Sequence, residues 1–316
     1  MPRVAAIDCG TNSIRLLVAD LVEGEQGISL RDVYRGMEIV RLGQGVDATG
    51  VLAPEALERT QRALAEFVKI LRQVGAGRVR MVATSATRDA ANREDFFAMV
   101  RATLGAEAEV ISGDEEAELS FVGAVGDLDP SDGPFVVTDV GGGSTEVVVG
   151  DVVDGKATIW AAESVDIGSV RITERCLPGD PPSPQEVAEA RRLAVEVLAE
   201  AFAEVPVSSA RTWVGVAGTV TSLSAIAQRL PRYDPDAVHL SRLSLDEVHQ
   251  VTEDLLAMSR AERGRLGSLH PGRIDVIGGG ALIVDTLATE LATRAGIREL
   301  VVSEHDILDG IARSLA

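Results

Sequence analysis

Residues 139–146 read DVGGGSTE, with three glycines between two acids, and residues 8–15 read DCGTNSIR. Each string follows one apolar run and precedes another, which predicts a strand, a tight turn and a returning strand. The two strings match at a constant offset of 131 residues (139 minus 8), pairing Asp8 with Asp139, Gly10 with Gly141 and Ser13 with Ser144. A repeated strand–turn–strand unit predicts two related domains.

The rest of the chain alternates strand and helix patterns, which indicates an α/β protein. A chain of 316 residues is long enough for two domains. The string GDLDPSDG at 126–133 is dense in turn formers and marks the expected boundary. We expect domains at 1–127 and 128–316, and the final helix, 304–316, can return to pack on the first domain.

Local patterns predict several elements of the first domain. A long amphipathic helix is expected from Pro54 to Gly75, and a second from Asn92 to Leu104. Residues 28–34 and 38–42 give two separate strand signals. The string TSATRDA at 84–90 is interpreted as a polar turn.

Composition limits the classes of partner. The formal net charge is -19, which repels nucleic acid and anionic membranes, so neither is expected as a partner. A phosphate-rich ligand would have to be met by local donors or by a bound cation. Cys9 and Cys176 show no CxxC spacing and are expected to be free thiols in a reducing cytoplasm. The apolar run before Asp8 is too short for a signal peptide or a membrane span.

The two loops suggest an anion site. Glycine lets backbone N–H groups approach an anion and lets the chain adopt positive φ, while Ser144 and Thr145 add hydroxyl donors. The flanking acids repel phosphate, so their presence predicts a divalent cation between them. The alternative for either loop alone is an ordinary hairpin turn, but two matched loops favour the ligand site. The chain contains no GxxxxGK[ST] and no GxGxxG, which excludes a P-loop and a dinucleotide fold.

The local sequence leaves the roles of several single charged residues undecided. Ser112 and Glu115 have capping-box spacing, so Glu115 has a structural role. Glu116 can act as a general base or complement the helix dipole, and without other evidence the dipole is favoured. Arg88 suits two phosphate oxygens, or pairs on the surface with Asp89 or Glu94.

Glycine also precedes a helix in GVAGTVTSLSAI at 215–226. The amides there favour an anion, or Gly218 only allows close packing of strand and helix. The four histidines show no paired metal spacing and are assigned no chemistry. In SEHD at 303–306, we expect Ser303 and Asp306 to form a cap.

Six strings occur in a fixed order: DCGTNSIRLLV, ATSATRDA, ISGDEEAELSF, TDVGGGSTEVVVG, DIGSVRITER and GVAGTVTSLSAI. Together they resemble the exopolyphosphatase and guanosine pentaphosphate phosphohydrolase family, of the short two-domain type. That family belongs to the actin, sugar kinase and Hsp70 superfamily of duplicated ribonuclease H-like domains. The resemblance implies hydrolysis of a terminal phosphoanhydride, with Mg2+, in a cleft between the two domains.

The resemblance also implies roles by position. Glu116 would activate water as the catalytic base. The metal would lie among Asp8, Asp139 and Glu146. Phosphate would be bound by Thr11, Asn12, Ser13, Arg88, Gly141, Gly142, Gly143, Ser144, Thr145, Gly218 and Thr219. Near the C-terminus, residues 307–310 read ILDG where many members have Leu-Arg-Glu-Gly, so one arginine contact is lost.

Three functions follow as hypotheses. The first is an exopolyphosphatase acting on inorganic polyphosphate. The second is a guanosine pentaphosphate (pppGpp) phosphohydrolase, ranked lower because an aromatic content of 3% offers few partners for a purine. The third is a sensor that binds polyphosphate or a nucleotide without turnover, which has no need of Glu116. A sugar or acetate kinase of the same superfamily is disfavoured by the motif around Glu116, and a homodimer is left open.

Overall fold

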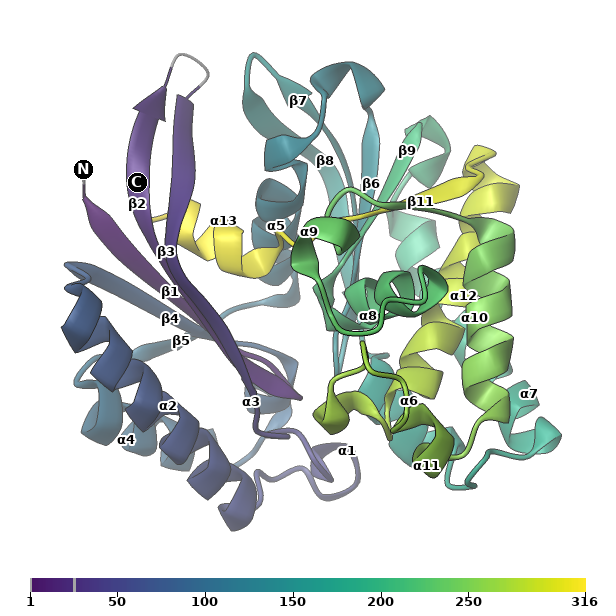
Figure 1. The fold of residues 1–316 in the computed structure, drawn as a ribbon, viewed down its shortest axis with the longest axis horizontal. Coiled ribbons are helices and arrows are strands. Elements are labelled where there is room, and N and C mark those ends of the chain that lie inside the picture. The colour runs from purple at the N-terminus through teal and green to yellow at the C-terminus, as the bar shows by residue number, and fades with distance from the viewer. Residues whose placement is uncertain (1, 25–26) are drawn as a thin grey trace. The chain divides into compact units, whose positions relative to one another are not determined.

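The computed structural model describes residues 2–24 and 27–316. The chain divides into two compact units, each an α/β structure (Figure 1). Unit 1 runs to Gly123 and resumes at Ile307–Ala316, and unit 2 is Ala124–Asp306. Each unit is described by itself.

The sheet of unit 1 has five strands in the order β3-β2-β1-β4-β5. The strands β1, β2 and β3 are antiparallel neighbours, whereas β4 and β5 run parallel to β1. Successive side chains of β1 lie on opposite faces of the sheet, as in any β-strand. Their bounds are β1 Arg3–Cys9, β2 Ser13–Gly24, β3 Gly27–Ile39, β4 Arg78–Ala83 and β5 Ala108–Val110.

Helices cover both faces of this sheet. Ala5, Ile7 and Cys9 pack in a core with α2 (Pro54–Val74) and α4 (Arg93–Leu104). The alternate residues Val4 and Ala6 pack instead with α13 (Ile307–Arg313), so the last helix of the chain completes unit 1 (Figure 1). The remaining helices of this unit are α1 Val46–Thr49, α3 Ser85–Asp89 and α5 Gly113–Ala124, the last of which ends in unit 2.

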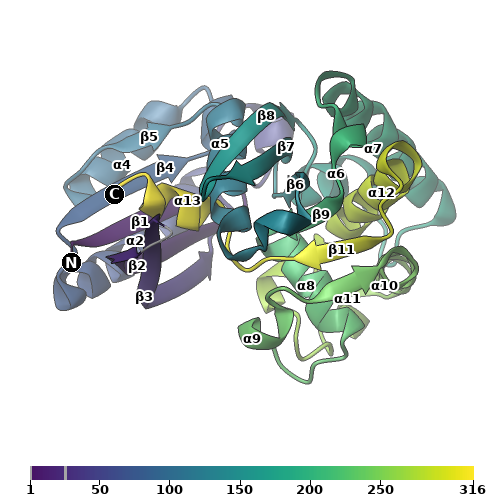
Figure 2. The same cartoon turned by 90° about the horizontal axis from the view of Figure 1, so that it is seen from above.

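The sheet of unit 2 has six strands in the order β10-β11-β9-β6-β7-β8 (Figure 2). A single core joins this sheet to its helices. The strands are β6 Phe135–Val140, β7 Thr145–Val153, β8 Lys156–Val165, β9 Thr212–Val216, β10 Arg242–Ser244 and β11 Glu299–Val302. The helices are α6 Ser169–Cys176, α7 Pro184–Glu204, α8 Ala217–Ala227, α9 Pro235–Val238, α10 Leu245–Ala257, α11 Arg260–Arg263 and α12 Ile277–Ala295.

The two units repeat one topology, as the sequence predicts. Without the short edge strand β10, unit 2 has the order β8-β7-β6-β9-β11, which corresponds to β3-β2-β1-β4-β5. The turn of unit 1 is closed by the Gly10 N–H donating to Ser13 O at 2.9 Å, and that of unit 2 by Gly141 N–H donating to Ser144 O at 3.1 Å. The pairing of the returning strand with the strand that follows it is also irregular at matching positions. The register shifts between Val18 and Ala19 in unit 1 and between Val149 and Gly150 in unit 2.

Helix boundaries follow the capping signals. Pro54 is the first residue of α2, and Gly75 ends it in the left-handed conformation at φ 72°. Ser183 opens α7 with a complete capping box to Glu186, followed by Pro184.

Two local predictions are corrected, and one strand was missed. Residues 28–34 and 38–42 are not two strands, because β3 runs unbroken over Gly27–Ile39, paired along its length with β2. The string at 84–90 is not an open turn but carries the helix α3, closed by Thr87 N–H and Arg88 N–H donating to Thr84 O. The strand β10 was not predicted, because three residues give no periodicity.

Candidate phosphate-binding and catalytic site

The glycine loop between β6 and β7 rests on the start of α6. The Ser169 N–H donates to Gly141 O at 2.9 Å, and the Val170 N–H donates to Gly142 O at 2.9 Å. A Cβ added at Gly168 would lie 2.4 Å from the carbonyl carbon of Gly142, so only glycine allows this approach. The carbonyl side of the loop is therefore fully engaged by α6.

The opposite side of the loop presents backbone N–H groups. In a trans peptide the N–H points away from the preceding C=O. The carbonyl of Gly143 is also held, by the Nε of Arg171 at 2.8 Å. The N–H groups of Gly142, Gly143 and Ser144 therefore point away from α6, and within the described chain none of them donates to a backbone carbonyl. Three adjacent N–H groups directed to one side form an anion-binding nest.

The reason for the glycines differs from the one expected. None of Gly141, Gly142 and Gly143 has a positive φ among the described residues. The prediction of left-handed backbone is therefore wrong. At Gly141 close approach favours glycine instead, since an added Cβ would lie 3.2 Å from Ser144 O, which is tighter than an ordinary contact.

The loop of unit 1 is held in a similar way by residues 40–43. The Val40 N–H donates to Asn12 O at 3.0 Å, and the Gly43 N–H donates to Thr11 O at 2.8 Å. A Cβ at Gly43 would lie 2.3 Å from Thr11 Cγ2, so this segment also approaches the loop closely. The arrangement turns the N–H of Asn12 away from the segment that holds the carbonyls.

The acids flanking the two loops have different cross-strand partners. Asp8 lies opposite Arg15 in the strand register, and Arg15 Nη2 contacts Asp8 Oδ2 at 2.7 Å. Asp139 lies opposite Glu146, and both side chains are buried. Side chains directly opposite on antiparallel strands have Cβ atoms roughly 5 Å apart. Carboxylate oxygens are the ligands that hard divalent cations take, so this donor set fits a divalent metal ion.

Glu116 and Arg88 contact each other. Arg88 Nη1 lies 3.0 Å from Glu116 Oε2 and donates to Ile111 O at 3.2 Å. Arg88 is in the last turn of α3 and Glu116 is in the first turn of α5. Arg88 thus forms an ion pair with the buried side chain of Glu116.

The neighbouring acid Glu115 has a different environment. Its N–H donates to Ser112 Oγ at 3.2 Å, but its carboxylate contacts Arg80 Nη2 at 2.6 Å. The second half of the expected capping box is therefore absent, because Arg80 competes for the carboxylate. Glu115 and Glu116 therefore contact different arginines, Arg80 and Arg88.

Thr145, Gly218 and Thr219 are less well suited to phosphate than the loop amides. Thr145 donates its hydroxyl to Ile167 O at 2.6 Å inside unit 2, which engages that donor. At Gly218 an added Cβ would lie 1.7 Å from Arg273 Nη1, so the guanidinium of Arg273 packs directly against this glycine. Thr219 is buried at the start of α8. The contact of Arg273 with Gly218 was not predicted, because Arg273 lies 55 residues (273 minus 218) further along the chain.

The structure also brings together Asp127, His239 and His305, which the sequence analysis left without chemistry. One ligand atom from each lies within 4.8 Å of the others. His239 Nδ1 accepts from the Glu304 N–H at 3.2 Å, so its Nε2 carries the proton and faces Asp127 Oδ2 at 3.5 Å. His305 Nδ1 also contacts that oxygen, and hydrogen bonds from the two rings hold the pKa of Asp127 below its ordinary value. Because the Nε2 lone pair of His239 is absent in this tautomer, we interpret the group as a hydrogen-bonded cluster.

Comparison with known proteins places these features in a family. The pattern that defines the Ppx/GppA phosphatase family matches residues 17–315. The chain belongs to the Ppx/GppA phosphatase family. It is 57% identical over 321 aligned positions to Exopolyphosphatase 2 of Mycobacterium tuberculosis, covering 100% of this chain and 99% of that protein.

Solved Ppx/GppA structures have the same fold. A crystal structure of an exopolyphosphatase-like protein is 43% identical with a TM-score of 0.93, covering 100% of this chain and 99% of that one. The Aquifex aeolicus member of the Ppx/GppA family is 31% identical with a TM-score of 0.79, covering 99% and 98%. The expected fold class, a duplicated α/β structure of ribonuclease H-like domains, is confirmed. No helix in the described residues has the length and apolar character needed to span a membrane.

Proposed function

We propose that this chain is an exopolyphosphatase, which hydrolyses the terminal phosphoanhydride of inorganic polyphosphate and releases orthophosphate. The observation that carries the proposal is the nest of three N–H groups at residues 142–144, adjacent to two buried acids at Asp139 and Glu146. Full-length similarity to Exopolyphosphatase 2 supports the same substrate class.

The loop amides have the role of binding the terminal phosphate. Backbone N–H donors fixed by α6 do not need to reorganise when negative charge shifts on the phosphoryl oxygens, and such preorganised donors are a major source of catalysis. The loop of Thr11, Asn12 and Ser13 and the side chain of Arg88 are further phosphate donors in this proposal. A change in either loop must then lower phosphate release.

Glu116 has the role of orienting and deprotonating the attacking water. The water oxygen forms a bond to the terminal phosphorus while the bond from that phosphorus to the bridging oxygen breaks. The proton leaves to Glu116, and the shortened polyphosphate keeps the bridging oxygen. The Arg88 contact at 3.0 Å holds the Glu116 carboxylate in place before substrate binds.

The acids Asp139 and Glu146 are proposed to hold a divalent cation, taken to be Mg2+, and Asp8 is a further acid assigned to cation binding. When bound, such an ion neutralises phosphate charge and supports the leaving oxygen. Ser164 Oγ donates to Glu146 Oε1 at 2.7 Å, which fixes the orientation of that carboxylate. Arg15 already neutralises Asp8 in part, so Asp139 and Glu146 carry the greater share of cation binding.

The test compares two adjacent acids. Glu116→Gln is expected to lower orthophosphate release from polyphosphate by about 100 to 10,000-fold, the range for loss of a general base. Glu115→Gln, the matched control, is expected to keep activity close to the parent because Glu115 contacts Arg80. Both proteins are assayed with and without Mg2+. Undiminished release by Glu116→Gln would remove this residue from the mechanism.

The same assay separates the alternatives. Polyphosphate and pppGpp are offered together at equal concentration, and preferential release from polyphosphate is expected. Preferential release from pppGpp would make the chain a pppGpp phosphohydrolase. Binding with no product over hours would identify a sensor. A cytoplasmic location is part of the proposal, supported by two cysteines that are both free thiols.

A further inference from the structure

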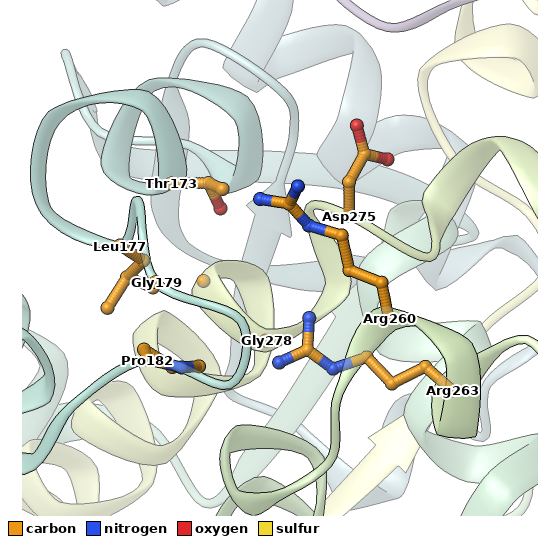
Figure 3. Close-up of a pocket in the computed structure, with 9 residues that line it drawn as sticks. Thr173, Leu177, Gly179, Pro182, Arg260, Arg263, Asp275 and Gly278 are labelled. Carbon is orange, nitrogen blue, oxygen red and sulfur yellow. The ribbon is translucent and has the colours of Figure 1, made fainter.

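A pocket lies in unit 2 between the end of α6, the short helix α11 and the start of α12 (Figure 3). Counting the space at its open mouth, its volume is about 230 Å³. It is lined by Thr173, Leu177, Gly179, Pro182, Arg260, Arg263, Asp275, Gly278 and Gly279. None of these residues belongs to the phosphate-binding set proposed above.

Arg263 is a buried cation in the wall of this pocket. Its side chain is part of a residue only 4% exposed, and its Nε donates to Leu255 O at 2.8 Å and its Nη1 to Ile274 O at 3.3 Å. Both partners are neutral carbonyls, and in residues 2–24 and 27–316 Arg263 forms no ion pair. Burial lowers the pKa of this guanidinium, as expected where charge is not compensated.

The unused part of this guanidinium faces the start of α12. Arg263 Nη2 would lie 3.2 Å from a Cβ added at Gly278. Within the described chain, the N–H groups of Gly278 and Gly279 donate to no backbone carbonyl, and Gly280 N–H is the first to do so, to Val276 O at 3.1 Å. A helix of 19 residues has a partial positive charge at this end.

A second guanidinium faces the same space. Arg260 is exposed and its side chain forms no ion pair within the described residues, while its backbone N–H donates to Asp180 Oδ1 at 2.6 Å. Figure 3 shows the guanidinium groups of Arg260 and Arg263 entering the pocket side by side, with Thr173 and Gly179 across from them. The acids near the pocket are Asp275 and Asp180, and neither is within ion-pair distance of Arg263.

We propose that this pocket is a second phosphate-binding site, separate from the loop of residues 141–144. Two guanidinium groups and the open amides at the start of α12 supply charged and directional donors for one tetrahedral oxyanion. The pocket is small, which favours a single phosphate group over a nucleotide. The phosphate is either free orthophosphate or one group of a polyphosphate chain.

The test measures binding of orthophosphate and of polyphosphate by calorimetry, using the full chain carrying Glu116→Gln so that polyphosphate is not consumed. Arg260→Glu is expected to weaken binding by about tenfold or more, the loss of one charge-assisted hydrogen bond with added repulsion. Arg265→Glu is the matched control, because Arg265 is an exposed arginine that does not line the pocket. Arg263→Lys keeps the charge but removes the planar fork, and is also expected to bind more weakly, with its fold checked by circular dichroism.

Weaker orthophosphate binding by Arg260→Glu but not by Arg265→Glu supports a site for the free anion. The same difference seen only with polyphosphate supports a site for a group within the chain. Equal binding by both variants, or no binding of either probe, overturns the proposal. Because the measurement is binding and not turnover, it stands whether or not the chain proves to be an exopolyphosphatase.

Discussion

Asp139 lies directly opposite Glu146 on strands β6 and β7, at the register position where unit 1 pairs Asp8 with Arg15. The duplicated framework thus carries an acid pair in one unit and an ion pair in the other. Two carboxylates offer a divalent cation more ligand oxygens than one carboxylate that already contacts an arginine. Cation binding is therefore expected to depend on unit 2 more strongly than on unit 1.

The first prediction concerns this acid pair. Glu146→Gln keeps the shape of the side chain but removes its charge, so we expect phosphate release to fall by about 100-fold at low Mg2+. Higher Mg2+ should restore part of the activity, which a Mg2+ titration of the release rate would show. Glu196→Gln, a surface acid that pairs with Arg192, serves as the control. An unchanged Mg2+ dependence in Glu146→Gln would exclude Glu146 as a ligand.

The second prediction concerns the support of the glycine loop. Arg171→Ala removes the donor that holds Gly143 O at 2.8 Å, which lets the adjacent amides rotate away from their common direction. A misplacement of about 1 Å lowers activity by about 100-fold. We expect the loss mainly in kcat, measured by steady-state phosphate release, with Arg192→Ala as the control. A loss confined to thermal stability would show that Arg171 only supports the fold.

Much of the framework could be predicted from the sequence, because the offset of 131 residues and the capping signals at Pro54 and Gly75 are local or repeated patterns. The purpose of the three glycines was misjudged, since close approach of Gly168 to Gly142 depends on a second segment. The contacts of Arg171 with Gly143 and of Arg273 with Gly218 were missed for the same reason.

A third prediction concerns α13, which contains the sequence ILDG. A Cβ at Gly310 would lie 2.0 Å from Leu119 O, and a backbone oxygen cannot move aside as a flexible side chain can. Gly310→Ala is expected to lower the free energy of unfolding by about 3 kcal/mol, measured by urea denaturation. The control is Gly77→Ala, where the nearest atom would be 3.7 Å from the added Cβ. Equal free energies of unfolding for the two variants would show that α13 moves away from Leu119 at no cost in stability.

A fourth prediction concerns pH. Asp20 contacts Arg3 at 2.8 Å and Arg31 at 2.9 Å, and hydrogen bonds from these arginines hold its pKa well below the ordinary value. A lowered folded-state pKa contributes stability above the unfolded pKa of about 3.9 and loses it as pH falls through the folded value. Asp20→Asn should therefore have a lower urea midpoint than the parent at pH 7.

The difference in urea midpoint between Asp20→Asn and the parent should narrow as pH falls below about 4, because Asp20 of the unfolded parent binds a proton there while folded Asp20 stays charged. Asp154→Asn, a change at an exposed turn residue that forms no ion pair within the described residues, provides the comparison. A difference that stays constant from pH 7 to pH 3 would mean that Asp20 acts through packing and not through its charge.

Unit 1 closes only with the last ten residues, Ile307–Ala316, whose helix α13 packs on strands begun near Arg3. Unit 2, by contrast, is an uninterrupted segment of the chain. During synthesis on the ribosome, the strands of unit 1 emerge before unit 2 and Ile307–Ala316 emerge after it, so unit 2 can complete its fold before unit 1 does. A stop codon that removes α13 would therefore leave unit 1 incomplete and unit 2 whole.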